Sequence, residues 1–145
     1  MSIGTAGLTA AASVLKIYES LENSDLPILV SGATGGVGSI AVMLLSKLGK
    51  EVSALTGKSS STDFLQSIGA SNIIMRDKYL ESDIKALERA SFSSAIDTVG
   101  GKILSKMLTQ ISPHGVVACC GNVAGIEVNT TCLLYTSDAA DEERG

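Results

Sequence analysis

The chain has 145 residues, of which 45% are hydrophobic, 18% are charged and 3% are aromatic, and its formal net charge is −4. This length fits one ordinary domain with a sizeable core, and 15 Gly with 2 Pro excludes a collagen-like or disordered chain. No apolar run approaches the ~20 residues that a membrane-spanning helix needs. An acidic balance with few aromatic side chains also argues against binding to nucleic acid or to an anionic membrane. We therefore expect a globular protein that has neither kind of partner.

The first segment predicts a helix over residues 5–21. Its apolar side chains fall on one side of that helix: Ala10, Val14, Ile17, Tyr18 and Leu21. The first basic residue is Lys16, so the basic start of a secretory or transit peptide is missing. We expect a cytoplasmic protein.

Five short apolar segments follow at regular intervals, several of them nearly continuous, as in strands buried on both faces. They cover residues 27–31, 51–55, 72–75, 94–97 and 115–119. Apolar side chains at helical spacing lie between them, in residues 37–48, 64–68, 80–87 and 103–111, with Ser82 and Asp83 as a cap for the third and Pro113 ending the last. This alternation predicts an α/β fold, a Rossmann-type doubly wound parallel sheet, with five of its six strands present in residues 1–131.

Residues 132–145 break this pattern. They resemble the translation of a transposase-type sequencing-library adapter, so we interpret them as a non-native tail on a domain truncated near Thr131. Four carboxylates against one arginine place most of the net negative charge in this tail. The sixth strand would fall where the tail begins. We expect residues 133–135 to dock there and residues 138–145 to be disordered.

The segment between the first predicted strand and its helix is rich in glycine, at Gly32, Gly35, Gly36 and Gly38. Glycine lets a pyrophosphate approach the backbone, and the following helix offers unpaired N–H groups to it. A strand, a glycine loop and an apolar-faced helix in this order predict a dinucleotide site. A Walker A loop is excluded because no Gly lies five residues before a Gly-Lys pair. A short-chain dehydrogenase is excluded because no Tyr has Lys four residues later.

The end of the second strand indicates which dinucleotide is expected. NAD-binding domains place Asp or Glu there to accept hydrogen bonds from the ribose 2′-OH. This chain has Thr56, Gly57 and Lys58 instead. A hydroxyl and an ammonium group favour a 2′-phosphate, which a carboxylate would repel, and Arg76 at the same sheet edge can add a second cation. We therefore predict NADP (NADPH) as the cofactor; the missing acid also disfavours a methyltransferase.

We predict no metal site and no catalytic residue. The chain has one histidine, His114, in a predicted turn, and Cys119 and Cys120 are adjacent, a spacing that suits neither a disulfide nor a metal ion. Asp97 and Thr98 follow the fourth strand and are expected to cap the next helix.

Several stretches together resemble one family: residues 3–10, 30–42, 65–70 with Arg76 and Asp77, and 95–100. They are similar to the quinone oxidoreductase branch of the medium-chain dehydrogenase/reductase superfamily, and within it to the zinc-free, NADPH-dependent acryloyl-CoA reductases. The likeness runs almost continuously over residues 3–131. It implies a GroES-like catalytic domain, which we expect to be missing from this chain together with the C-terminal return to it.

The resemblance also implies a set of cofactor contacts. The family's pyrophosphate contacts fall on Thr34, Gly35, Gly36 and Val37. Its 2′-phosphate contacts fall on Thr56, Gly57 and Lys58, with Arg76 beside them. Asn122 matches a position on the nicotinamide side. Where the family usually has Ser-Gly-Arg, this chain has Thr-Gly-Lys, which keeps the charge but loses the bidentate guanidinium.

The implied activity is hydride transfer from NADPH to an activated double bond, such as that of acryloyl-CoA, or to a quinone. Its partner is then a small enoyl-thioester or quinone, and a homodimer is conceivable for the full-length protein. Two alternatives stay open: a zinc-dependent alcohol dehydrogenase of the same superfamily, and a non-catalytic NADPH-sensing or nucleic-acid-binding relative. We expect the 145-residue chain itself to be inactive.

Overall fold

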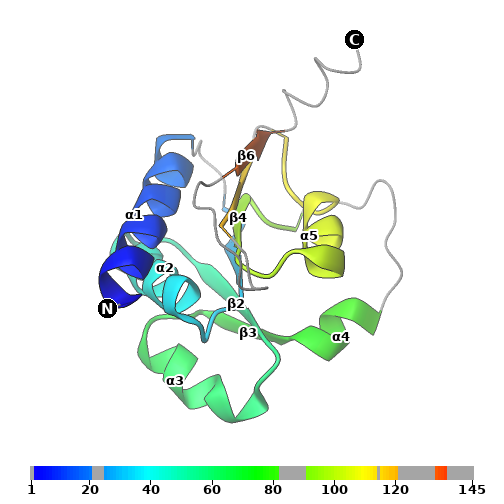
Figure 1. Cartoon of the computed structure of the whole chain (residues 1–145). Coiled ribbons are helices and arrows are strands. Elements are labelled where there is room, and N and C mark those ends of the chain that lie inside the picture. Colours follow the sequence, from blue (N-terminus) through cyan, green and yellow to red (C-terminus); the bar gives the residue numbers. More distant parts are fainter. Residues whose placement is uncertain (1, 21–24, 82–90, 114, 121–132, 137–145) are drawn as a thin grey trace.

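One six-stranded sheet organises the chain, with helices on both of its faces (Figure 1). The computed structural model describes residues 2–20, 25–81, 91–113, 115–120 and 133–136. Its α-helices and strands are α1 (Ser2–Ser20), β1 (Ile28–Ser31), α2 (Gly36–Lys47), β2 (Val52–Thr56), α3 (Thr62–Ser67), β3 (Asn72–Met75), α4 (Arg76–Glu81), β4 (Ser94–Asp97), α5 (Gly101–Leu108), β5 (Val116–Cys119) and β6 (Leu133–Thr136).

The strand order is β3-β2-β1-β4-β5-β6, and β1 to β5 all run parallel. Strand β1 pairs with β2 on one side and with β4 on the other, so the chain crosses over β1 after β3. In open sheets of this kind, ligands bind outside the carboxyl ends of the strands at such a crossover point. The predicted doubly wound fold is confirmed, and it places the end of β1 at that position.

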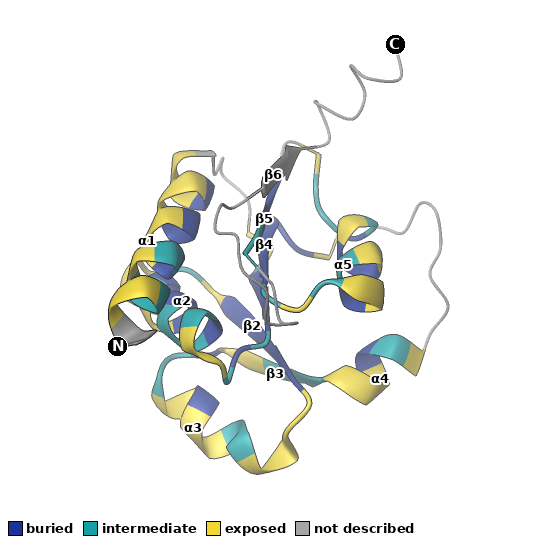
Figure 2. Cartoon of the chain, in the orientation of Figure 1, coloured by how far each residue is buried: buried dark blue, intermediate teal, exposed yellow. Residues whose placement is uncertain are grey.

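The strands owe their apolar character to burial on both faces. Every residue of β1, β2 and β4 is buried (Figure 2). On one face, α1, α2 and α3 cover the core that includes Val30, Val42 and Leu65. On the other face, α4 and α5 pack around Leu29 and Met107. Because both faces of the sheet are covered by helices, these strands show no alternation of apolar and polar residues in the sequence.

The sixth strand differs in direction from the other five. Strand β6 pairs antiparallel with β5, with Cys119 opposite Leu133 and Val116 opposite Thr136. It occupies the sixth position of the sheet, where residues 133–135 were expected to dock. An antiparallel strand begins beside the end of its neighbour and therefore needs no crossover helix. The interpretation of residues 132–145 as a non-native tail stays a prediction.

Three helices differ from their predicted extents by three residues or more, and the first of them, α1, begins at Ser2 instead of residue 5. The segment expected as a helix over residues 80–87 has its described part in α4, which begins at Arg76; the predicted cap at Ser82 and Asp83 lies outside the described residues. Helix α5 ends at Leu108, short of Ile111. The Gln110 carbonyl accepts hydrogen bonds from the backbone N–H groups of residues 91 and 92, so the chain leaves the helix to reach that segment. None of the described helices is long and apolar enough to cross a membrane.

Removing residues 137–145 should leave the free energy of unfolding unchanged within roughly 0.5 kcal/mol, as for surface changes in general. The reason lies in the sequence, because this stretch combines four carboxylates with small residues and has no apolar period to bury. Thermal unfolding of the whole chain and of a chain ending at Thr136 tests this. A loss of several kcal/mol would show that the segment is part of the folded domain.

Candidate functional site

The glycine loop joins the end of β1 to α2 and is built by close backbone packing. Gly32 has a φ of +60°, and its carbonyl accepts a hydrogen bond from Gly35 N (3.0 Å). A Cβ atom at Gly38 would lie 2.2 Å from the Gly32 oxygen, so only glycine fits there. The first helical hydrogen bond runs from Ser39 N to Gly35 O (2.9 Å). The N–H groups of residues 36 and 37 precede that bond and can therefore face an anion.

A buried carboxylate ties this loop to the neighbouring strand. Asp97, at the end of β4, is 1% exposed, and its Oδ1 accepts a hydrogen bond from the Ser31 hydroxyl (2.9 Å). It also accepts from Val99 N (3.2 Å) and Gly100 N (2.8 Å), just before α5. Thr98 donates two hydrogen bonds to Ser31: its N–H donates to the Ser31 hydroxyl, and its own hydroxyl donates to the Ser31 carbonyl, each at 3.0 Å. Capping of α5 by Asp97 and Thr98, as expected from the sequence, is not what these side chains do: Asp97 accepts from the N–H groups of residues 99 and 100, which precede the first helical residue, and both Thr98 bonds go to Ser31. The network instead joins the loops that follow β1 and β4.

A cleft of about 290 Å³ opens at the carboxyl ends of β1, β2 and β3. It brings together six of the residues predicted from the sequence, and three apolar side chains that were not predicted. The lining residues are Gly32, Thr34, Thr56, Gly57, Lys58 and Arg76, with Leu55, Val99 and Ile103. Nothing in the sequence distinguishes these three from ordinary core residues, because apolar side chains fill every strand and helix here.

Two cations lie at one end of the cleft. Thr56 pairs with Met75 across β2 and β3, so the residues that follow them are neighbours. A Cβ atom at Gly57 would lie 2.8 Å from the guanidinium carbon of Arg76, which shows that this guanidinium rests directly on the glycine backbone. The Arg76 side chain is 52% exposed, and its Nε is 3.9 Å from Asp77 Oδ1, a loose contact with a carboxylate that is almost fully exposed. The Thr56 hydroxyl accepts a hydrogen bond from Lys58 N (3.0 Å), which fixes the loop that carries this lysine.

The remaining predicted residues have separate places. Gly35 and Gly36 are exposed at the start of α2, Val37 is half-buried in its first turn, and Gly38 is buried against the loop. None of these four lines the cleft itself. Asn122 lies outside the described residues, so its predicted nicotinamide contact stays a prediction.

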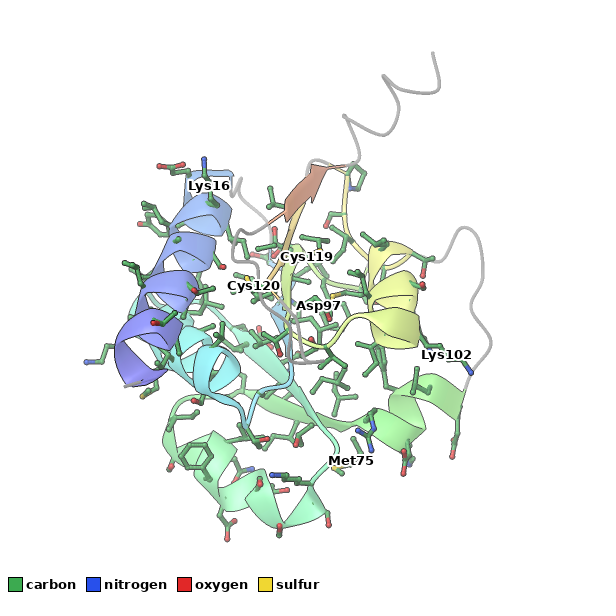
Figure 3. All side chains as sticks on the ribbon, viewed as in Figure 1. Lys16, Met75, Asp97, Lys102, Cys119 and Cys120 are labelled. Atoms are coloured by element: carbon green, nitrogen blue, oxygen red, sulfur yellow. The ribbon has the colours of Figure 1, made fainter. Side chains whose placement is uncertain are left out.

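Metal ligands do not gather in the part of the chain that the structure describes, where no three His, Cys, Asp or Glu residues are grouped closely enough to hold an ion. Cys119 packs into the core beneath α5, and Cys120 into the core beneath α1. These adjacent thiols therefore lie on opposite faces of the sheet (Figure 3).

The sequence of the chain matches a known protein family. The family model described as "Zinc-binding dehydrogenase" matches residues 36–139. The chain belongs to this family. That assignment, with the relatives below, confirms the resemblance to the quinone oxidoreductase branch of the medium-chain dehydrogenases, to which acryloyl-CoA reductases also belong.

Two curated relatives of this zinc-binding dehydrogenase family member stand out. "Probable acrylyl-CoA reductase AcuI" of Escherichia coli is 45% identical over 136 residues, which cover 93% of this chain and 41% of the relative. "Putative quinone oxidoreductase YhfP" of Bacillus subtilis is 43% identical with the same coverage. The chain thus spans about 41% of the length of these relatives.

Solved structures agree with this family assignment. The chain is similar to E. coli YhdH with bound NADPH, with a TM-score of 0.78 and 45% identity over 90% of this chain and 40% of that one. It is also similar to B. subtilis yhfP with NAD bound, with a TM-score of 0.77 and 43% identity over 88% of this chain and 39% of that one. The yhdH oxidoreductase of Salmonella enterica, in complex with NADP, has a TM-score of 0.77 and 44% identity over 88% of this chain and 39% of that one. Two of these three similar structures therefore hold NADP or NADPH, and one holds NAD.

Proposed function

We propose that the chain is the NADPH-binding part of a reductase that acts on activated carbon–carbon double bonds. The observation that carries the choice of NADPH is the pair of cations at the end of β2. Lys58 lines the cleft there, and the Arg76 guanidinium rests on Gly57. An NAD-binding domain would have a carboxylate at the end of this strand, and a 2′-phosphate dianion would be repelled by one.

The residues of the cleft and of the adjoining glycine loop suit the successive parts of such a cofactor. The pyrophosphate would lie against the backbone of Gly35 and Gly36, where the N–H groups of α2 begin. Leu55, Val99 and Ile103 offer apolar contact for an adenine ring. When bound, the reduced nicotinamide supplies the hydride, and this chain's residues hold and orient the cofactor.

Substrate preference in this proposal rests on the relatives. The name of AcuI supports an acrylyl-CoA type of enoyl-thioester, and that of YhfP supports a quinone as the second candidate. In the first case hydride reaches the β-carbon of the double bond and a proton then reaches the α-carbon. A zinc-dependent alcohol dehydrogenase activity and a non-catalytic role stay as alternatives, and the cytoplasmic location and homodimer stay predictions.

A titration of the 145-residue chain with NADPH and with NADH, followed by nicotinamide fluorescence, tests the cofactor assignment. We expect NADPH to bind more tightly by about tenfold or more, which corresponds to about 1.4 kcal/mol. We also expect no turnover with acryloyl-CoA or quinones, because the chain covers only 41% of its reductase relatives. Equal affinity for the two cofactors would contradict the proposal, and measurable turnover would show that the substrate site lies within this chain.

A further inference from the structure

A buried lysine of α5 contacts α4 and is not among the residues that line the cleft. Lys106 of α5 is only 3% exposed, and its Nζ donates a hydrogen bond to the Tyr79 carbonyl (2.5 Å). The same Nζ lies 4.8 Å from the centre of the Tyr79 ring, within reach of a cation–π interaction. One ammonium group therefore holds both the backbone and the side chain of the same residue in α4.

Tyr79 is fixed at its other end as well. Its hydroxyl donates a hydrogen bond to Gln110 Oε1 (2.5 Å), and Tyr79 and Gln110 are 7% and 9% exposed. Lys106 lies in α5, and Gln110 lies two residues after the end of that helix. Tyr79 is therefore held at both ends by residues from the α5 side of the fold. A helix as short as α4, with six residues, has little stability of its own and depends on such tertiary contacts.

The position of α4 matters because Arg76 is its first residue. Arg76 lies one helical turn before Tyr79, and its guanidinium rests on Gly57 at the cationic end of the cleft. The Tyr79 carbonyl belongs to the last turn of α4, where the helix dipole makes a cation favourable. Any shift of this turn along the sheet would carry the backbone of Arg76 with it.

We propose that Lys106 is a positioning residue for recognition of the 2′-phosphate: it anchors α4 through Tyr79 and so keeps the Arg76 guanidinium over Gly57. This inference rests on the proposed NADPH function. It predicts that a residue without any place in the cleft affects the choice between NADPH and NADH. A residue that only stabilised the fold would change the affinities for both cofactors alike.

The test measures dissociation constants for NADPH and NADH in Lys106→Met, which keeps the length of the side chain and removes the ammonium group. We expect the NADPH constant to rise about fivefold or more, as for the loss of one oriented hydrogen bond, with little change for NADH. Lys102→Met is the matched control, because Lys102 is exposed on the same helix (Figure 3) and its loss changes the net charge equally. Lys106→Gln keeps a donor and should retain more of the preference; it replaces the Met variant if that variant does not fold.

A double-mutant cycle with Arg76→Met separates the two proposals. In the Arg76→Met background, Lys106→Met should cause no further loss of NADPH preference, because the group that it positions is gone. If Lys106→Met keeps the full preference, or lowers it equally with and without Arg76, the positioning role is wrong. If Arg76→Met and Lys58→Asp both leave the preference unchanged, the NADPH assignment itself fails.

Discussion

Replacing Gly38 with Ala should abolish tight cofactor binding and lower the free energy of unfolding by about 3 kcal/mol. A Cβ atom at Gly38 would lie 2.2 Å from the Gly32 oxygen and 2.9 Å from the Ala33 Cα. Both are backbone atoms, so the clash is relieved only by moving the loop that connects β1 to α2. That movement would displace the N–H groups at the start of α2 from their positions toward the pyrophosphate.

Gly4→Ala is the matched control for this variant. Gly4 lies in α1, and a Cβ atom there would have no atom within 4 Å. The exchange should therefore leave binding unchanged and stabilise the helix by about 0.5–1 kcal/mol. Urea unfolding and NADPH titration measure both effects. Normal affinity in Gly38→Ala would mean that the glycine loop does not contact the cofactor.

Replacing Lys58 with Asp should erase or invert the preference for NADPH. The exchange removes one charge-assisted contact, worth about 1–3 kcal/mol, and adds a carboxylate that repels a 2′-phosphate and can accept from a 2′-OH. NADH affinity should stay the same or rise. The two dissociation constants, measured at low and at high ionic strength, report the effect, and salt should reduce the wild-type preference because Lys58 is exposed.

Lys16→Asp serves as the control for the change in charge. Lys16 is exposed on α1, which covers the opposite face of the sheet from α4 and α5 (Figure 3). The same two-unit change in charge at that distance should leave the ratio of the two affinities nearly unchanged. A wild-type preference that survives Lys58→Asp would remove Lys58 from the 2′-phosphate site and leave Arg76 as the cation to test.

Much of this protein could be predicted because its patterns are local. A strand buried on both faces has to be apolar throughout, and β1, β2 and β4 are therefore visible as short apolar segments. The glycines between β1 and α2 have a local reason too, since Gly32 has a positive φ and Gly38 has no room for a side chain. These features depend on a few consecutive residues, so the sequence by itself determined the fold class and the position of the candidate dinucleotide site.

The details of the cleft depend on residues that are distant in the chain. Arg76 reaches Gly57 only because β3 pairs with β2 in one particular register, and Lys106 meets Tyr79 only because α5 packs beside α4. Similarly, Val99 and Ile103 are ordinary apolar residues until the sheet places them at the cleft. Register and packing are decided by the whole core rather than by neighbouring residues. For this reason the sequence placed Arg76 at this sheet edge, but only the tertiary structure decided that its guanidinium rests on Gly57, what anchors it, and that the sixth strand runs antiparallel to the fifth.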